Sequence, residues 1–190
     1  MSDNGVVTAP EGTAAEVAES FAAADPETSR SRTLTWQDPV ATAAAGATMT
    51  GMEYMTAVVT GQVPPPPIAV TMNLRPVELE EGRVVFEGLP GEEHYNPIGV
   101  VHGGYAATLL DSALGCAVHT TLPAGIAYTS LGLEAKYLRP LTRDTGRVLC
   151  EATVLYRGRK QATAEATLTA AEGGKLLASG TATCMILGEA

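Results

Sequence analysis

A single carboxylate, Asp111, lies in an otherwise uncharged stretch of the sequence between Asn96 and Val118. Its neighbours in the chain are mostly small or apolar, so burial without a partner would cost several kcal/mol or force the acid to take up a proton. Beside a ligand, such a carboxylate is a candidate general base or nucleophile. The structural alternative is an acid that is exposed at a helix edge or bonded to a neighbouring loop.

Two adjacent glycines, Gly103 and Gly104, stand at the start of the apolar helix predicted over about 101–120. Unpaired amides and the positive end of the helix dipole can stabilise a developing oxyanion there. Glycine also lets a ligand approach the backbone closely. The pair is equally typical of a tight turn, and no phosphate-loop or dinucleotide spacing accompanies it.

The spacing of the candidates suggests a site shared between two subunits. Asp111 lies nine residues beyond His102, roughly two and a half turns along the helix. One subunit can hardly bring this acid onto an oxyanion bound at its own helix start. Two subunits related by a two-fold axis can, if each offers its helix start to the other's acid. Asn96 and His102 add polar groups just upstream, although His102 is also a candidate capping or turn residue.

The elements that must position these residues follow from the hydrophobic period. The helix over about 101–120 is apolar nearly all round, so it must be enclosed. Beyond it, apolar and polar residues alternate in four segments separated by turn-forming residues, which predicts an antiparallel meander. Before the helix, residues 68–90 are predicted to hold two or three short strands, including a hairpin with its turn at Glu80-Glu81-Gly82. The predicted class is α+β, with a long central helix wrapped by an antiparallel β-sheet.

Three parts of the chain are predicted. Residues 1–33 form an acidic tail without sustained apolar periodicity, expected to be disordered. Residues 34–62 form a helical segment, and residues 63–190 form the main domain. The proline run at 64–67 is expected to end the helix as a stiff extended linker. Four residues at helical spacing are expected to pack in the core rather than bind a ligand: Met49, Met52, Met55 and Val58.

Composition excludes several function classes. A formal net charge of −9 argues against nucleic acid or an anionic membrane as a partner. Polar residues interrupt every apolar run long enough to span a membrane. The start lacks the pattern of a secretion signal, so a cytoplasmic location is expected. Three widely spaced cysteines without a CxxC pattern predict core filling rather than a metal site or disulfides: Cys116, Cys150 and Cys184.

The order Asn-Pro-x-Gly-x-x-His-Gly-Gly followed by Leu-Leu-Asp resembles the signature of hotdog-fold acyl-CoA thioesterases, in particular the phenylacetyl-CoA (PaaI-like) branch. The motifs YLRP at 137–140, RGRK at 157–160 and the closing TATCMIL resemble the same branch. The resemblance covers roughly residues 63–187 and implies a hotdog fold over the main domain. It also implies obligate dimers, often paired into tetramers, with the active site between subunits.

The resemblance also implies roles for individual residues. Asp111 is expected to be the general base or nucleophile at the thioester, and the Gly103 amide to polarise its carbonyl. Asn96 is expected to orient the water or the carbonyl, and His102 to support the loop or bond the thioester. In related enzymes a serine or threonine near the start of the next strand helps to place the water. Ser130 fits this role best, with Thr129 next.

The implied substrate is an acyl-CoA ester with an aromatic or medium-chain acyl group, and coenzyme A is part of that substrate rather than a cofactor. Gly104 is expected among the substrate-binding residues. Because coenzyme A carries phosphates, cations in the strand-end turns are candidates to bind it. These are Arg139, Arg143, Arg157, Arg159 and Lys160.

Two other functions are compatible with a hotdog fold. A non-catalytic acyl-CoA binding or sensing module would keep the pocket, but binding alone does not need a desolvated carboxylate such as Asp111. Hydration of an enoyl thioester is the other possibility. The spacing of His102 and Asp111 resembles the thioesterase pattern rather than the hydratase one, so hydrolysis is the favoured prediction.

Overall fold

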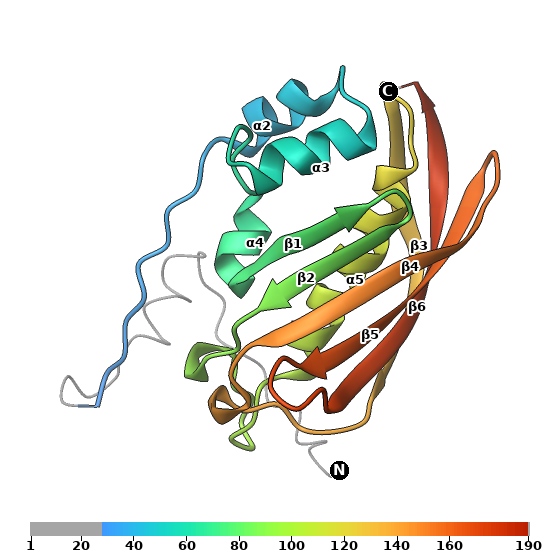
Figure 1. Ribbon diagram of the computed structural model, residues 1–190. Helices are drawn as coiled ribbons and strands as arrows, with labels where there is room; N and C mark the ends of the chain where they lie inside the picture. Colours follow the sequence, from blue (N-terminus) through green and yellow to red (C-terminus); the bar gives the residue numbers. More distant parts are fainter. Residues whose placement is uncertain (1–27, 190) are drawn as a thin grey trace, which may run out of the picture. The chain divides into compact units, whose positions relative to one another are not determined.

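The computed structural model describes residues 28–189, and Figure 1 shows one sheet with a long helix against it. Most of the acidic tail predicted over 1–33 lies outside the described residues. Residues 28–33 carry neither helix nor strand. The compact unit that contains the candidate site begins at Leu34. Within residues 28–189, no helix combines the length and the apolar character needed to cross a membrane.

Two short helices, α2 (Pro39–Gly46) and α3 (Gly51–Val59), form the predicted helical segment. They are separate because Thr50 caps α3. Its hydroxyl accepts a hydrogen bond from the Glu53 amide, and the Glu53 carboxylate accepts one from the Thr50 amide. Met49 therefore lies between the helices. Met55 is buried, but Met55 and Val58 also line a cavity, so the prediction of core packing rather than ligand contact is not confirmed for them.

The proline run is not an extended linker throughout, because Pro67 begins a third short helix, α4 (Pro67–Met72). Proline suits the first turn of a helix, where its missing amide hydrogen has no intrahelical acceptor to lose. The residues after it were expected to begin a strand and are helical instead. Asn73, with a φ of 52°, ends α4 in the left-handed conformation and leads into the sheet.

The sheet has six antiparallel strands in the order β1-β2-β4-β5-β6-β3. The predicted hairpin is present, and Gly82 supplies the positive φ (79°) that its turn requires. Only β4, β5 and β6 form the predicted meander. β3 pairs with β6 rather than β4, because β2 already occupies that edge of β4. The strands are β1 (Leu74–Glu80), β2 (Arg83–Gly88), β3 (Ile126–Tyr137), β4 (Val148–Arg157), β5 (Gln161–Ala170) and β6 (Leu176–Glu189).

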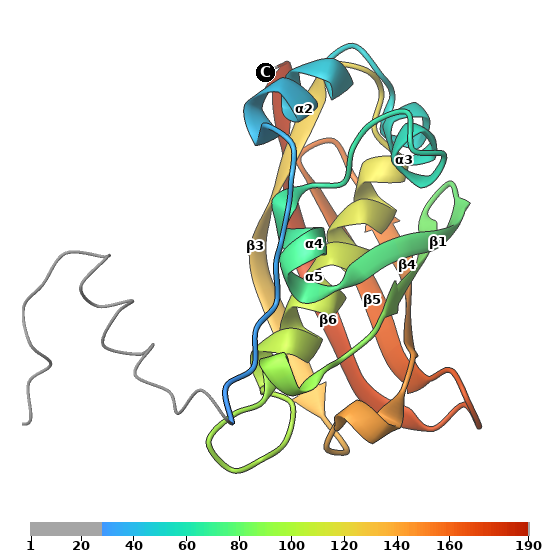
Figure 2. The same ribbon diagram turned by 90° about the vertical axis from the view of Figure 1, so that its left-hand side faces the viewer.

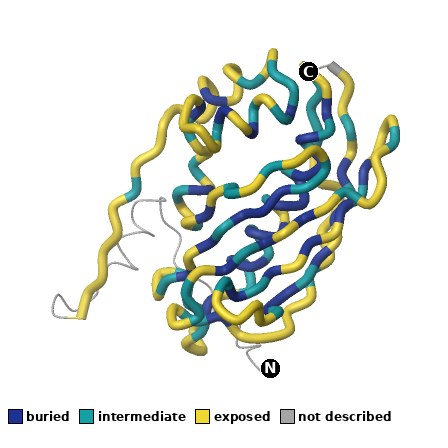
Figure 3. The backbone as a smooth tube through the Cα atoms, in the orientation of Figure 1, coloured by how far each residue is buried: buried dark blue, intermediate teal, exposed yellow. Residues whose placement is uncertain are grey.

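The long helix α5 (Gly103–Thr120) contacts all six strands, which curve around it (Figures 1 and 2). Its sheet-facing side is fully buried, including Leu109, Leu110 and Leu114. Figure 3 shows the alternation of buried and exposed residues along the strands that face it. The sequence predicted a helix enclosed on every side, but the sheet covers only part of the circumference of α5. In the single chain one stripe is only partly covered or exposed: Gly104, Ala107, Thr108, Asp111 and Ser112.

Candidate active site

Asp111 lies in the middle of α5, on the stripe that the sheet does not cover. Its side chain is exposed in the single chain, and its Oδ1 atom accepts a hydrogen bond of 3.0 Å from the Ser130 hydroxyl of β3. The sequence left open whether this acid was buried beside a ligand or exposed with a partner. The single chain places it in the second arrangement, with a hydroxyl bound to one oxygen of an accessible carboxylate.

A largely apolar cavity of about 230 Å³ opens beside this pair. Helices α3 and α4, the α5 residues from Asp111 to Cys116, and strands β1, β2 and β3 supply its walls. The side chains that line it include Met55, Val58, Ile68, Ala69, Leu74 and Phe86. A carboxylate at the edge of an apolar cavity can act on the polar end of a ligand whose other end is apolar.

Three other titratable groups line this cavity but cannot serve as nucleophiles near neutral pH: Tyr54, Cys116 and Tyr128. Burial, with a smaller contribution from the charge of Asp111, raises the pKa of the Cys116 thiol to about 12. Burial also raises the pKa of Tyr128 well above its ordinary value. Burial raises the pKa of Tyr54 above its ordinary value as well. All three groups therefore stay protonated, and Asp111 is the candidate for base or nucleophile here.

At the start of α5, His102 is the N-cap, which agrees with its prediction as a capping residue. Its Nδ1 atom accepts a hydrogen bond of 2.8 Å from the Gly104 amide. The Gly103 amide is the first of the helix and has no acceptor within residues 28–189. A second cavity of about 340 Å³ opens in front of it, lined by Gly103, His102, Ala106 and residues 137–141. The free amide and the helix dipole make this a candidate oxyanion site.

Asn96 folds the loop that leads to the helix. Its Oδ1 atom accepts hydrogen bonds from the amides of Ile98 (3.1 Å) and Val100 (3.3 Å). This oxygen is therefore engaged by the backbone, and the role predicted for Asn96 toward water or the carbonyl stays a prediction.

In the single chain, the candidate base Asp111 and the candidate oxyanion donor Gly103 do not lie in the same cavity. Gly103 and Asp111 line different cavities. Eight residues separate them on one straight helix, a distance of about 12 Å along its axis. A group bound to the Gly103 amide is therefore out of reach of the Asp111 carboxylate of the same chain.

The structure distinguishes between the two hydroxyl candidates on β3. Ser130 pairs across the sheet with Cys184, which is fully buried on the side that faces α5. Thr129 is its neighbour along the strand and points to the opposite face. A register shift between Ser130 and Gly132 interrupts the alternation at Leu131, which is half exposed.

The predicted cations fall in three places. Arg139 lines the cavity at Gly103, where its guanidinium donates to the Leu176 carbonyl oxygen. Arg157, Arg159 and Lys160 lie at the β4–β5 turn and line neither of the two cavities. The turn is two to three strands away from Ser130 in the sheet, about 10–14 Å. Arg143 forms ion pairs with Glu92 and Asp144.

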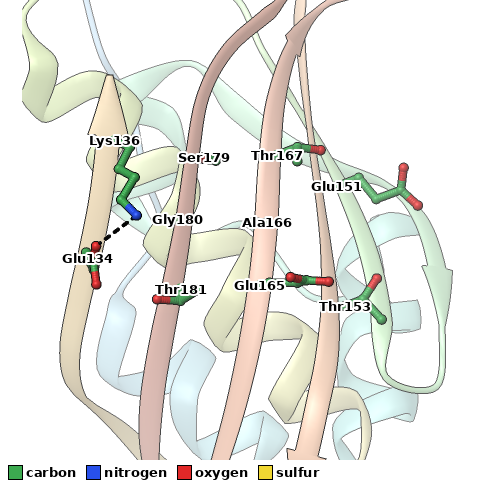
Figure 4. A pocket seen from close by; sticks show the side chains of 10 residues that line it. All are labelled: Glu134, Lys136, Glu151, Thr153, Glu165, Ala166, Thr167, Ser179, Gly180 and Thr181. Atoms are coloured by element: carbon green, nitrogen blue, oxygen red, sulfur yellow. Dashed lines mark ion pairs between the residues drawn. The ribbon is translucent and has the colours of Figure 1, made fainter. Parts of the chain in front are cut away.

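A third hollow, of about 410 Å³, lies on the face of the sheet away from α5 (Figure 4). Its side chains are mainly threonine, serine and glutamate, and Lys136 pairs with Glu134 at 3.2 Å. The sheet separates this hollow from Asp111. Its polar lining does not suit an apolar ligand, so we place the candidate active site on the α5 side.

Sequence reasoning missed the aromatic residues beside Asp111. Tyr54 of α3 and Tyr128 of β3 both line the Asp111 cavity. A signal was available at Gly115, four residues after Asp111 and so on the same helix face. A Cβ atom at Gly115 would lie 3.1 Å from the Tyr128 hydroxyl, so the glycine leaves room for this ring against the helix.

His119 lies between these tyrosines, with ring centroids 5.5 Å from Tyr54 and 5.3 Å from Tyr128. Burial lowers the pKa of His119 below its ordinary value, so the folded protein binds fewer protons here than the unfolded chain. The stability that this neutral imidazole contributes is fully present above about pH 6.5 and is lost as the pH falls toward the folded pKa. We expect the unfolding free energy of the wild type to fall more between about pH 7.5 and 5.5 than that of His119→Gln.

Urea denaturation at both pH values measures this difference. Equal decreases of the unfolding free energy in the two proteins would show that His119 titrates alike in the folded and unfolded states.

The sequence model of the thioesterase superfamily matches residues 98–177, which include Gly103, Asp111 and Ser130. Acyl-coenzyme A thioesterase 13 of Homo sapiens is 35% identical over 104 residues, which cover 55% of this chain and 73% of the human protein. The chain belongs to the thioesterase superfamily.

Solved structures resemble this thioesterase over most of their own length. A phenylacetic acid degradation-related protein of Ralstonia eutropha is 29% identical, with a TM-score of 0.63 over 70% of this chain and 98% of its own. A Streptococcus mutans protein solved with acetyl CoA is 25% identical, with a TM-score of 0.56 over 62% of this chain and 90% of its own. The predicted hotdog fold, the PaaI-like resemblance and the thioester hydrolase class are confirmed.

Proposed function

We propose that this thioesterase hydrolyses an acyl-CoA ester with an aromatic or medium-chain acyl group to the free acid and coenzyme A. The observation that carries the proposal is the exposed carboxylate of Asp111, hydrogen-bonded by Ser130 at the edge of an apolar cavity. The name of the human relative and the acetyl CoA in the Streptococcus mutans protein support an acyl-CoA substrate. No cofactor is proposed, because coenzyme A is part of the substrate.

The proposed reaction uses two groups. Asp111 accepts a proton from a water molecule that attacks the thioester carbon, or attacks this carbon itself to form an anhydride that water then hydrolyses. The Gly103 amide donates a hydrogen bond to the carbonyl oxygen as it becomes negative. On the first route the carbon–sulfur bond breaks after water adds, and the coenzyme A thiolate takes up the proton held by Asp111. On the second route this bond breaks as the anhydride forms, and the thiolate takes up the proton released when water hydrolyses the anhydride. Ser130 holds the Asp111 carboxylate in place, and His102 caps the helix that presents the amide.

We further propose that the active site forms between two subunits, because one chain holds Asp111 and Gly103 apart. The β3 edge of the sheet has no neighbouring strand within the described residues, and it carries exposed apolar side chains at Leu131, Leu133 and Tyr137. Beside it runs the partly uncovered stripe of α5 that includes Asp111. A second copy added about a two-fold axis would cover both surfaces and bring its Gly103 toward Asp111.

Coenzyme A is proposed to extend away from the apolar cavity, because its phosphates require water or cations. Arg139, on the wall of the Gly103 cavity, is the candidate nearest to the proposed oxyanion site. Arg157, Arg159 and Lys160 remain candidates for the phosphates, and Gly104 for a further contact with the substrate.

The direct test is thiol release from a panel of phenylacetyl-, benzoyl-, short-chain and long-chain acyl-CoA esters. We expect turnover of the aromatic and medium-chain esters. A folded protein that binds these esters but releases no thiol from any of them would contradict the proposal and favour a binding module. Consumption of an enoyl-CoA without thiol release would instead indicate a hydratase.

A further inference from the structure

The apolar cavity beside Asp111 runs inward from the carboxylate. Asp111 and Ser130 are exposed, whereas Met55, Phe86 and Gly115 on the same cavity walls are buried. The residues that α5 contributes extend from Asp111 to Cys116, a distance of about 7–8 Å along the helix axis. The reacting end of a ligand therefore lies at the outer end of the cavity, and the rest of the ligand points inward.

The acyl group is the part of the proposed substrate that fits this cavity. Coenzyme A is far larger than 230 Å³ and carries several charges, so it does not fit inside this largely apolar cavity. A dry apolar cavity of about 150 Å³ is large enough for benzene. The cavity beside Asp111 therefore has room for one aromatic ring with its linking carbons, or for a short aliphatic chain.

Two tyrosines lie beside Cys116, at the inner end of the α5 segment. Tyr128 packs against the backbone of α5 at Gly115. Tyr54 of α3 packs against the end of α2, where a Cβ atom at Gly46 would overlap its ring. His119 fills the space between the two rings. Both side chains are therefore supported from behind and cannot retreat easily from a longer ligand.

We propose that Tyr54 and Tyr128 form an end wall that sets the maximum length of the acyl group; this inference rests on the proposed function. The Tyr54 side of the wall belongs to a segment that precedes the superfamily match at residues 98–177. Helices α3 and α4 supply much of the remaining lining, so acyl-length selection depends on residues 51–72 as well as on the hotdog sheet.

The test measures kcat/KM over a series of straight-chain acyl-CoA esters of increasing length. Tyr54→Ala removes one of the two rings of the end wall and so lengthens the cavity. We expect the acyl chain that this variant prefers to be longer than that of the wild type by about three carbons. Each methylene that becomes buried should raise kcat/KM for the longer esters by about fourfold. Tyr54→Phe keeps the ring and is the matched control, with an unchanged length profile.

A second variant tests the inference with the opposite sign and does not depend on the stability of Tyr54→Ala. Val58→Phe adds bulk on the α3 wall of the cavity at a half-buried position, so it should shorten the preferred chain. An unchanged length profile in Val58→Phe and in any folded Tyr54→Ala, with turnover of the shortest esters retained, would overturn the end-wall proposal and leave the proposed function intact. A wild-type protein that releases thiol from no ester would overturn both.

Discussion

Replacing Asp111 with asparagine is expected to lower kcat for thioester hydrolysis by roughly 10²- to 10⁴-fold, the range that general base catalysis contributes. The amide oxygen of asparagine can still accept the Ser130 hydrogen bond, so the geometry of the site is retained. The amide can neither accept a proton from water nor form an anhydride. Because Asp111 is exposed in the single chain, we expect little change in the stability of the fold.

Thiol release and binding of the intact ester, measured on the same preparations, separate catalysis from recognition. Asp111→Asn should still bind the ester that it no longer hydrolyses. Glu134→Gln is the matched control, since it makes the same isosteric change at an exposed carboxylate of β3 on the other side of the sheet. Turnover reduced by less than about tenfold in Asp111→Asn would remove this residue from its proposed role.

Replacing Gly103 with proline is expected to lower kcat by roughly 10²- to 10³-fold, the usual effect of losing one oxyanion donor. Proline removes the amide hydrogen proposed to bind the carbonyl oxygen. Gly103 is the first residue of α5, the helical position that tolerates proline best. His102 before it already has an extended backbone with a ψ of 138°, which suits a residue that precedes proline.

Gly103→Ala is the control that keeps the amide hydrogen. Its Cβ atom would lie 3.3 Å from the Tyr137 ring, a tight contact with a side chain that is half exposed and can move. Both variants add this contact, so the difference in kcat between them measures the contribution of the amide hydrogen. Equal kcat values for Gly103→Pro and Gly103→Ala, at unchanged thermal stability, would place the oxyanion donor elsewhere.

The sequence predicts the elements whose signals are local. The apolar run before Pro123 predicts α5, and the alternation of small residues predicts β4, β5 and β6. The partner of β3 depends on which strand edge is free, and the sequence does not show this. The sequence therefore predicts a meander of four consecutive strands, whereas β3 pairs with β6 in the structure. Helix α4 was missed because a short apolar segment after prolines has the composition of a strand as well as of a helix.

The residues of the candidate site also divide into those that the sequence identifies and those that only the packing of distant elements reveals. Asp111 stands out because no other charge lies near it in the sequence, and the helix start stands out because His102 and two glycines mark it. Tyr54 and Tyr128 come from α3 and β3, and nothing in the spacing of two aromatic residues distinguishes a cavity wall from ordinary core packing. Their positions require the packing of distant elements around Gly115.

The most direct test of a site shared between subunits is the activity of a mixed dimer. Co-expression of Asp111→Asn and Gly103→Pro subunits with different affinity tags allows the mixed dimer to be isolated from both parents. If Asp111 of one subunit acts with Gly103 of the other, one site carries both defects and the second is intact, so about half of the wild-type activity returns. A mixed dimer as inactive as its parents would show that the two residues do not meet across the interface.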